Sequence, residues 1–348
     1  MSSPGKSTVR SRNQSFDALR GIAIALVMLR HALPDHLPGA GVVGVVIFFT
    51  LSGYLITGLL RDELVATNRI NLLGFYWRRL ARLGPALLVL VAGMAAVTVL
   101  IDPIGDRNTL VRTIAVALTW TADLPVGGTS PAAFHLWTLA LEEQFYLGWP
   151  IVLLLLHRVG STPAGVYIAV AACWFAALVT TVWLIEEPDL GYALPTSWAV
   201  SMAIGAAVRV ATSGDRVPST LLVIAASLVL LGACLVDLRG HVYTYVGVGP
   251  AIAGLAGVLL VWSRAHPRTQ WPPSRIAEWL GYRSYSAYLW NYPLSIWLDA
   301  HSGTARALLA TALTVIAADL SYRLVERPCQ RALLRKPKHP LEEPTCAV

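Results

Sequence analysis

The chain has 348 residues, of which 55% are hydrophobic and 14% are charged, and its mean hydropathy is +0.59. A soluble globular domain carries about 25% charged residues, so this composition excludes an ordinary soluble domain and favours a polytopic membrane protein. The net charge of +7 fits basic loops on the cytoplasmic side of a membrane, and we expect membrane lipid as a partner and no nucleic acid.

Ten apolar stretches are each about 17 to 23 residues long, which is enough for a helix to cross the hydrocarbon core. They predict an all-α polytopic membrane bundle of about ten transmembrane helices. These stretches are residues 17–35, 42–60, 84–101, 138–157, 164–185, 194–211, 219–237, 243–262, 279–298 and 303–325. An eleventh apolar stretch, 109–122, is shorter and contains Arg112.

The charges of the loops predict the topology. If 109–122 does not cross, most loop arginines and both termini fall on one side, which the positive-inside rule assigns to the cytoplasm. We therefore expect 109–122 to be re-entrant or packed on the outer face. The predicted parts are a cytoplasmic tail (1–15), a transmembrane domain (16–328) and a basic cytoplasmic tail (329–348), in the plasma membrane. The first span has no small-residue cleavage site, so we expect it to remain as a signal anchor.

The first span, "FDALRGIAIALVMLRHALP", carries Arg20, Arg30 and His31. Arg20 and His31 are separated by 11 positions, which places them about 20° apart around a helix and about 16 Å apart along it. Ionisable groups inside a membrane span commonly mark a functional site. Arg20 could instead snorkel to the interface, and His31 could be a hydrogen-bonded helix contact. The shared face favours function for the pair, while Arg30 has no predicted partner.

The second and third spans add a serine and a basic cluster. In "GVVIFFTLSGYLITGLL", small residues such as Gly53 favour close helix packing, and Ser52 could hydrogen-bond a ligand. In "FYWRRLARLGPAL", Arg78 and Arg82 are four positions apart and share a helical face. The cluster fits a lipid-facing basic anchor or a phosphate site, because arginine pairs bidentately with phosphate oxygens.

The fourth span, "HLWTLALEEQFYLGWPIV", contains the adjacent acids Glu142 and Glu143. Carboxylates in an apolar helix are costly, so at least one should be paired or functional. The predicted topology places both at about the depth of His31, where a carboxylate would orient the imidazole ring. Alternatively, both acids are solvated at the outer interface. The four cysteines lack metal-ligand or CxxC spacing, and we expect no metal.

Four of these motifs, in this order, resemble the acyltransferase-3 family of membrane-bound acyltransferases. The resemblance runs from about residue 15 to 328. It rests on the Arg-x10-His element of the first span, "FFTLSGYL" (48–55), "WRRLARLGPA" (77–86) and "WTLALEEQFYL" (137–147). It implies transfer of an acyl group, often acetyl, from acyl-CoA to a hydroxyl of a carbohydrate, glycolipid or secondary metabolite. The late element "YLWNYP" departs from the family, because Asn291 stands where a histidine is usual.

The resemblance also implies roles for individual residues. His31 would be the general base and Glu142 the acid that orients it. The predicted contacts of the acyl-CoA co-substrate are the arginines and the serine, namely Arg20, Arg78, Arg82 and Ser52, with Arg79 in the same basic mouth.

Two other classes of function remain open from the residues alone. One is a small-molecule transporter or flippase that uses Arg20, His31 and Glu142 as a proton relay. Inverted repeats would favour such a transporter, and the sequence shows none. The other is a non-catalytic membrane scaffold, which would not require His31 and Glu142 at matching depth.

Overall fold

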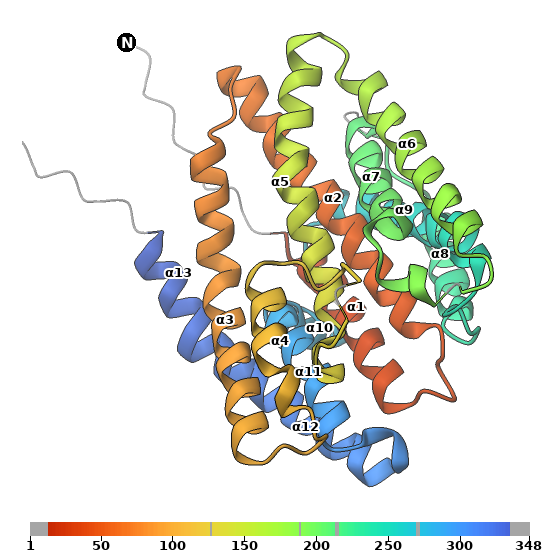
Figure 1. The fold of residues 1–348 in the computed structure, drawn as a ribbon. Coiled ribbons are helices and arrows are strands. Elements are labelled where there is room, and N and C mark those ends of the chain that lie inside the picture. The colour runs from red at the N-terminus through yellow and green to blue at the C-terminus, as the bar shows by residue number, and fades with distance from the viewer. Residues whose placement is uncertain (1–12, 126, 188, 213–215, 269–271, 335–348) are drawn as a thin grey trace, which may run out of the picture.

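Figure 1 shows a computed structural model of the chain, which describes residues 13–334 except 126, 188, 213–215 and 269–271. Within these residues the protein is all-α, without a strand, as predicted. Most of the predicted tails, 1–15 and 329–348, lies outside the described residues. The helices are α1 (Gln14–Ala32), α2 (Ala40–Thr67), α3 (Leu72–Leu100), α4 (Leu110–Leu118), α5 (Leu136–Arg158), α6 (Thr162–Trp183), α7 (Pro195–Ala211), α8 (Thr220–Ala233), α9 (Gly249–Ala265), α10 (Pro272–Tyr282), α11 (Ser284–Trp297), α12 (Thr304–Ser321) and α13 (Arg327–Leu333).

Six helical segments of the described chain are long and apolar enough to cross a membrane, so the chain is an integral membrane protein. The helix α1 is not among them, because its 19 residues include the charged side chains Asp17, Arg20 and Arg30. The full number of crossings stays a prediction. The six segments are Ala40–Thr67, Leu72–Leu100, Leu136–Arg158, Thr162–Trp183, Thr244–Ala265 and Thr304–Leu333.

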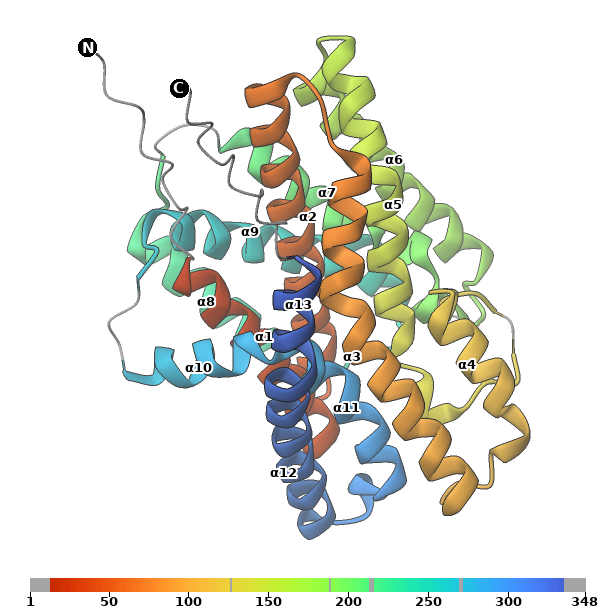
Figure 2. The ribbon, with the colours of Figure 1, turned by 90° about the vertical axis from the view of Figure 1, so that its left-hand side faces the viewer.

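The short stretch 109–122 forms the nine-residue helix α4. At 1.5 Å per residue α4 is about 14 Å long, which is too short to cross the hydrocarbon core. In Figure 2, α4 lies beside α3 and the first turns of α5 near the lower end of the molecule. The helix is therefore consistent with the prediction that this stretch does not cross.

The prediction of a single helix over 279–298 is wrong. The chain breaks at Arg283 (φ −105°, ψ 2°) into α10 and α11, and α10 runs across the bundle at a steep angle to α12 (Figure 2). Arg283 is buried, and its Nε donates a 2.6 Å hydrogen bond to Asp319 Oδ1 in α12. An ion pair with another helix thus holds the break, and no local sequence pattern reveals such a partner.

The two crossing helices α1 and α10 touch backbone to backbone. A Cβ atom added at Gly21 would lie 1.8 Å from the carbonyl oxygen of Ala277, and one added at Gly281 would lie 1.8 Å from that of Asp17. Glycine is required at both positions because no side chain fits there. This contact fixes how α1, with Arg20 and His31, is placed against the second half of the chain.

The helices α2 and α7 make a similar close contact. A Cβ atom at Gly53 would lie 1.9 Å from the carbonyl oxygen of Met202, and one at Gly205 would lie 2.0 Å from that of Thr50. The predicted role of Gly53 in close packing is therefore confirmed.

Two hydrophobic cores are separated by a region that contains cavities. The main core packs α1, α2, α7 and α9 together, and a second core packs α3 against the start of α5 and against α11. Between them, α1, α2, α3, α5 and α11 surround the polar residues that the sequence singled out.

Candidate active site

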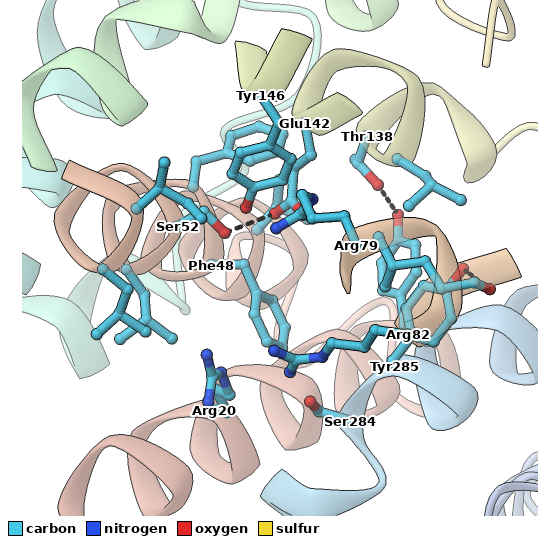
Figure 3. A pocket seen from close by; sticks show the side chains of 18 of the residues that line it. Arg20, Phe48, Ser52, Arg79, Arg82, Thr138, Glu142, Tyr146, Ser284 and Tyr285 are labelled. Carbon is cyan, nitrogen blue, oxygen red and sulfur yellow. Dashed lines mark hydrogen bonds between the residues drawn. The ribbon is translucent and has the colours of Figure 1, made fainter. Parts of the chain in front are cut away.

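A cavity of about 260 Å³ lies between α1, α2, α3, α5 and α11. We call it the arginine cavity. Its charged and hydroxyl-bearing lining residues are Arg20, Ser52, Arg79, Arg82, Thr138, Glu142, Tyr146, Ser284, Tyr285 and Tyr288. Figure 3 shows Arg20 and Arg82 reaching in from one side and Ser52, Arg79 and Glu142 from the other, with Phe48 between them. Three of the four predicted co-substrate contacts, Arg20, Arg82 and Ser52, are thus brought together.

The arginine cavity continues toward the end of the molecule where α1 begins. Arg20 and Arg82 also line an adjoining cavity, whose other polar lining includes Asn13, Asp17 and Gln330. Arg20 Nη1 lies 3.2 Å from Asp17 Oδ1 one turn earlier on α1. Two arginines therefore stand at the passage between a polar outer chamber and a more apolar inner one.

The fourth predicted contact, Arg78, is exposed and does not line the arginine cavity. Its neighbour Arg79 takes that place. Arg79 Nη2 lies 2.9 Å from Glu143 Oε1, and the guanidinium carbon lies 3.2 Å from the ring centroid of Tyr146. The pair that shares the cavity face is thus Arg79 and Arg82, at the i,i+3 spacing that also places side chains on one helix face.

Glu142 lies in the arginine cavity, apart from His31. Ser52 Oγ donates a 3.1 Å hydrogen bond to Glu142 Oε1, whereas His31 bonds to a different residue. The residues of this segment that line a cavity with His31 are His135, just before α5, and Trp137 and Thr138 in its first turn. Glu142 follows Thr138 by about one helical turn. The predicted pairing of Glu142 with His31 is therefore not found in the structure, where the two side chains line different cavities.

His31 lines a second cavity, of about 130 Å³, near the end of the molecule where α1 ends. We call it the histidine cavity. Its polar and aromatic lining residues are Arg30, His31, Phe134, His135, Trp137, Thr138, Tyr192, Arg239, Tyr288, Tyr292 and His301. Sequence reasoning singled out His31 but missed His135, although the tripeptide "HLW" that opens the fourth motif contains it.

The ring of His31 is held by Asn291 of α11. His31 Nδ1 lies 2.5 Å from Asn291 Oδ1, and Asn291 Nδ2 donates to Thr314 Oγ1 at 3.4 Å. The Thr314 hydroxyl in turn donates to the carbonyl oxygen of Ala310 at 2.7 Å, so it can accept from the asparagine amide. This chain orients the amide with its oxygen toward His31. Nδ1 of His31 therefore carries a proton, and in the neutral ring Nε2 has the lone pair.

The two cavities meet at a shared wall made by Val45, Thr138 and Tyr288, which line both. Thr138 Oγ1 donates a 2.6 Å hydrogen bond to the Tyr288 hydroxyl, which donates at 2.8 Å to the carbonyl oxygen of His135. Arg20 and His31 thus lie on one helix but line different cavities, which this wall separates.

A family model described as an acyltransferase domain, that of the acyltransferase-3 family, matches residues 13–323. The chain belongs to the acyltransferase-3 family.

Comparison with curated proteins finds named relatives. The chain is 29% identical to the peptidoglycan O-acetyltransferase OatA of Listeria monocytogenes, over 91% of this chain and 56% of the relative. It is 28% identical to the O-acetyltransferase OatA of Staphylococcus aureus, over 90% of this chain and 57% of the relative. The chain therefore spans somewhat more than half the length of these relatives. No solved structure matches the chain.

Proposed function

We propose that this acyltransferase-3 member is a membrane O-acetyltransferase that moves an acetyl group from acetyl-CoA to a hydroxyl of a carbohydrate, glycolipid or other metabolite. The observation that carries the proposal is the pair of cavities on either side of one thin wall, one rich in arginine and one containing His31. The names of the relatives favour acetyl as the acyl group. The family match favours an acyltransferase over the transporter alternative.

In this proposal the arginine cavity and its adjoining chamber bind the co-substrate. The phosphates of CoA lie near Arg20 and Arg82, where guanidinium groups form charge-assisted hydrogen bonds with phosphate oxygens. The pantetheine arm follows α1 inward. Arg20 and His31 are separated by about 16 Å along α1, a distance comparable to the reach of that arm. The thioester then reaches the wall of Val45, Thr138 and Tyr288.

His31 acts as the general base from the other side of the wall. Its Nε2 takes the proton of the acceptor hydroxyl while that oxygen attacks the thioester carbonyl carbon. The carbon–sulfur bond breaks, and the imidazolium returns the proton to the leaving thiolate, which gives the acetyl ester and free CoA. The hydrogen bond from Nδ1 to Asn291 selects the neutral tautomer in which Nε2 has a lone pair for the acceptor proton. Glu142, bonded to Ser52, belongs in this scheme to the co-substrate cavity.

We also propose an orientation in the plasma membrane. The loops at the upper end in Figure 1, between α2 and α3 and between α5 and α6, follow Arg61 and Arg158 and include Arg69. The positive-inside rule assigns such loops, and with them both termini, to the cytoplasm, where CoA is made. The acceptor then enters the histidine cavity from the opposite side. A peptidoglycan acceptor, as in the name of the Listeria relative, is one candidate.

The proposal is tested with purified protein in detergent micelles, with radiolabelled acetyl-CoA and soluble glycan fragments as acceptors. His31→Ala should lower the rate of acetyl transfer by about 10²- to 10⁴-fold, the usual contribution of a general base. The matched control is His157→Ala, because His157 is half-buried, lines neither cavity and bonds to Asn68 in the α2–α3 loop. Undiminished transfer by His31→Ala would exclude the proposed base, and a lack of transfer from acetyl-CoA by the native protein would exclude the proposed reaction.

A further inference from the structure

The charge of the histidine cavity is unusual for a site between apolar helices. Its lining includes two arginines, Arg30 and Arg239, and three histidines, His31, His135 and His301, and no aspartate or glutamate is among its lining residues. Of the two arginines, Arg30 is half-buried at the end of α1, and a cation near the bilayer interior is costly unless it is paired or binds a ligand. The proposed chemistry uses His31 alone, so it leaves the two arginines without a task.

Arg30 lies one position before His31 on α1, yet both side chains reach this cavity. Its stem packs over Gly41, where a Cβ atom would lie 3.0 Å from Arg30 Cγ, so the absence of a side chain at Gly41 gives the stem its place. The side chain is half-buried, and no hydrogen bond or ion pair joins it to any described residue. Its position in the last turn of α1 is favoured by the helix dipole, but the guanidinium donors keep their capacity for a ligand.

Arg239 approaches the same cavity from the loop after α8. Its guanidinium carbon lies 4.8 Å from the ring centroid of Tyr192 and 5.4 Å from that of Phe134. These rings hold the cation through cation–π contacts. Its ion pair with Asp189 is long, at 3.8 Å, and the side chains of Arg239 and Asp189 are 48% and 74% exposed. Such a solvated pair is weak, so Arg239 still presents positive charge to the cavity.

The remaining walls are aromatic. Trp137, Tyr192 and Tyr292 line the cavity. The rings of His31 and Tyr292 pack edge to face, with their centroids 5.1 Å apart. Mostly apolar walls with a few placed polar groups are typical of small-molecule sites. Flat aromatic faces also suit the carbon-bound hydrogens of a sugar ring. The cavity therefore combines a surface for a ring, a base and two cations.

We propose that the acceptor of this protein carries an anionic group, a carboxylate or a phosphate, which Arg30 and Arg239 bind while the acceptor hydroxyl lies at Nε2 of His31. This inference rests on the proposed acetyl transfer for the role of its ligand as acceptor. The planar guanidinium donors match both carboxylate and phosphate oxygens. An anion bound by these two arginines is held close to His31, since Arg30 and His31 are neighbours on α1, and the hydroxyl of the same molecule is thereby positioned.

The test compares three soluble sugars, namely methyl β-glucoside, methyl β-glucuronide and glucose 1-phosphate. Binding to the native protein is measured by isothermal titration calorimetry in detergent, without acetyl-CoA. At least one of the anionic sugars should bind about tenfold or more tightly than the neutral one, the factor expected for charged hydrogen bonds. The tighter of the two anionic sugars identifies the carboxylate or the phosphate. The preference should weaken as salt is added.

Arg30→Gln and Arg239→Gln should each lower the affinity for the preferred anionic sugar by about tenfold, and Arg30→Lys should retain part of it. The control is Arg306→Gln. Arg306 is exposed, pairs with Asp299 at 2.8 Å, and does not line the cavity, so its loss should leave the preference unchanged. Equal binding of all three sugars by the native protein, or equal losses in the Arg306 variant, would overturn the inference.

Transfer assays with the same sugars separate this inference from the proposed reaction. Release of free CoA at equal rates with neutral and anionic sugars would overturn the anionic acceptor and leave acetyl transfer standing. Preferential binding of an anionic sugar, with no CoA released in any mixture, would contradict the proposed reaction but support the anion site.

Discussion

Asn291→Leu is the substitution that tests most directly how the site works. Asn291 is 2% exposed, and its amide oxygen accepts the 2.5 Å hydrogen bond from Nδ1 of His31. Leucine has the same branched shape and the same number of side-chain heavy atoms, but no acceptor. We therefore expect the ring of His31 to lose the contact that holds the proton on Nδ1, and part of the population to move it to Nε2, where the base must be free.

The size of the effect follows from the lost contact. Leaving a buried donor without its partner costs about 1–3 kcal/mol, which corresponds to about a 5- to 150-fold loss in kcat if the cost falls on the reactive arrangement of His31. The KM for acetyl-CoA should not change, because Asn291 does not line the arginine cavity. A fall in kcat without a rise in this KM separates a positioning role from a general loss of structure.

The assay is steady-state acetyl transfer by purified variants, with the acceptor saturating. Asn291→Asp keeps the acceptor atom toward His31, so it should stay within about tenfold of the native kcat. The matched control is Ser295→Ala, one turn further along α11. Ser295 is buried and bonds to the carbonyl oxygen of Asn291, but it does not line either cavity and should keep nearly native activity.

Two results would refute this reasoning. If Asn291→Leu keeps the native kcat, the hydrogen bond does not set the state of His31. If Asn291→Asp is as inactive as Asn291→Leu, an acceptor at this position is not what the site requires.

Two further variants test the co-substrate site and the helix packing. Arg82→Gln should raise the KM for acetyl-CoA about tenfold or more through the loss of charged hydrogen bonds. Arg78 lies outside the cavity, so Arg78→Gln should change this KM less than about twofold. Equal effects of the two variants in kinetic assays would contradict the assignment of Arg82 to the co-substrate site. Gly281→Val should lower the Tm in detergent by about 5 °C or more, because its Cβ would lie 1.8 Å from the carbonyl oxygen of Asp17. Gly148 has open space around it, so Gly148→Ala should leave the Tm unchanged. Similar Tm values for both variants would show that the α1–α10 contact is not tight.

The sequence alone was sufficient for the class of fold and for the helix that carries both ends of the site. Long apolar runs with few charges leave only a membrane bundle, because backbone polar groups in lipid must bond within helices. The spacing of Arg20 and His31 predicts one helix face, and both residues do line cavities in the region between the two cores. These inferences hold because helical periodicity is a local property of the chain.

The partners of these residues could not be predicted in the same way. Periodicity says which side chains share a face, but not how that face is rotated against four other helices. The spacing in the sequence pairs Arg78 with Arg82 on one helix face, whereas Arg79 and Arg82 are the residues of this cluster that line the arginine cavity. The sequence also pairs Glu142 with His31, whereas in the structure Ser52 donates to Glu142. Arg30, which had no predicted partner, reaches the histidine cavity because Gly41 on α2 leaves room for its stem.

Local sequence determined the all-α membrane class of the fold, the basic start of α3 and the spacing of Arg20 and His31 on α1. Only the tertiary structure decided that Asn291, 260 positions from His31, holds its ring, and that α10 and α11 are separate helices. The physical reason is that both outcomes depend on contacts between distant helices. The glycine contact between α1 and α10 and the hydrogen bond from Arg283 to Asp319 orient these helices, and that orientation brings Asn291 to His31.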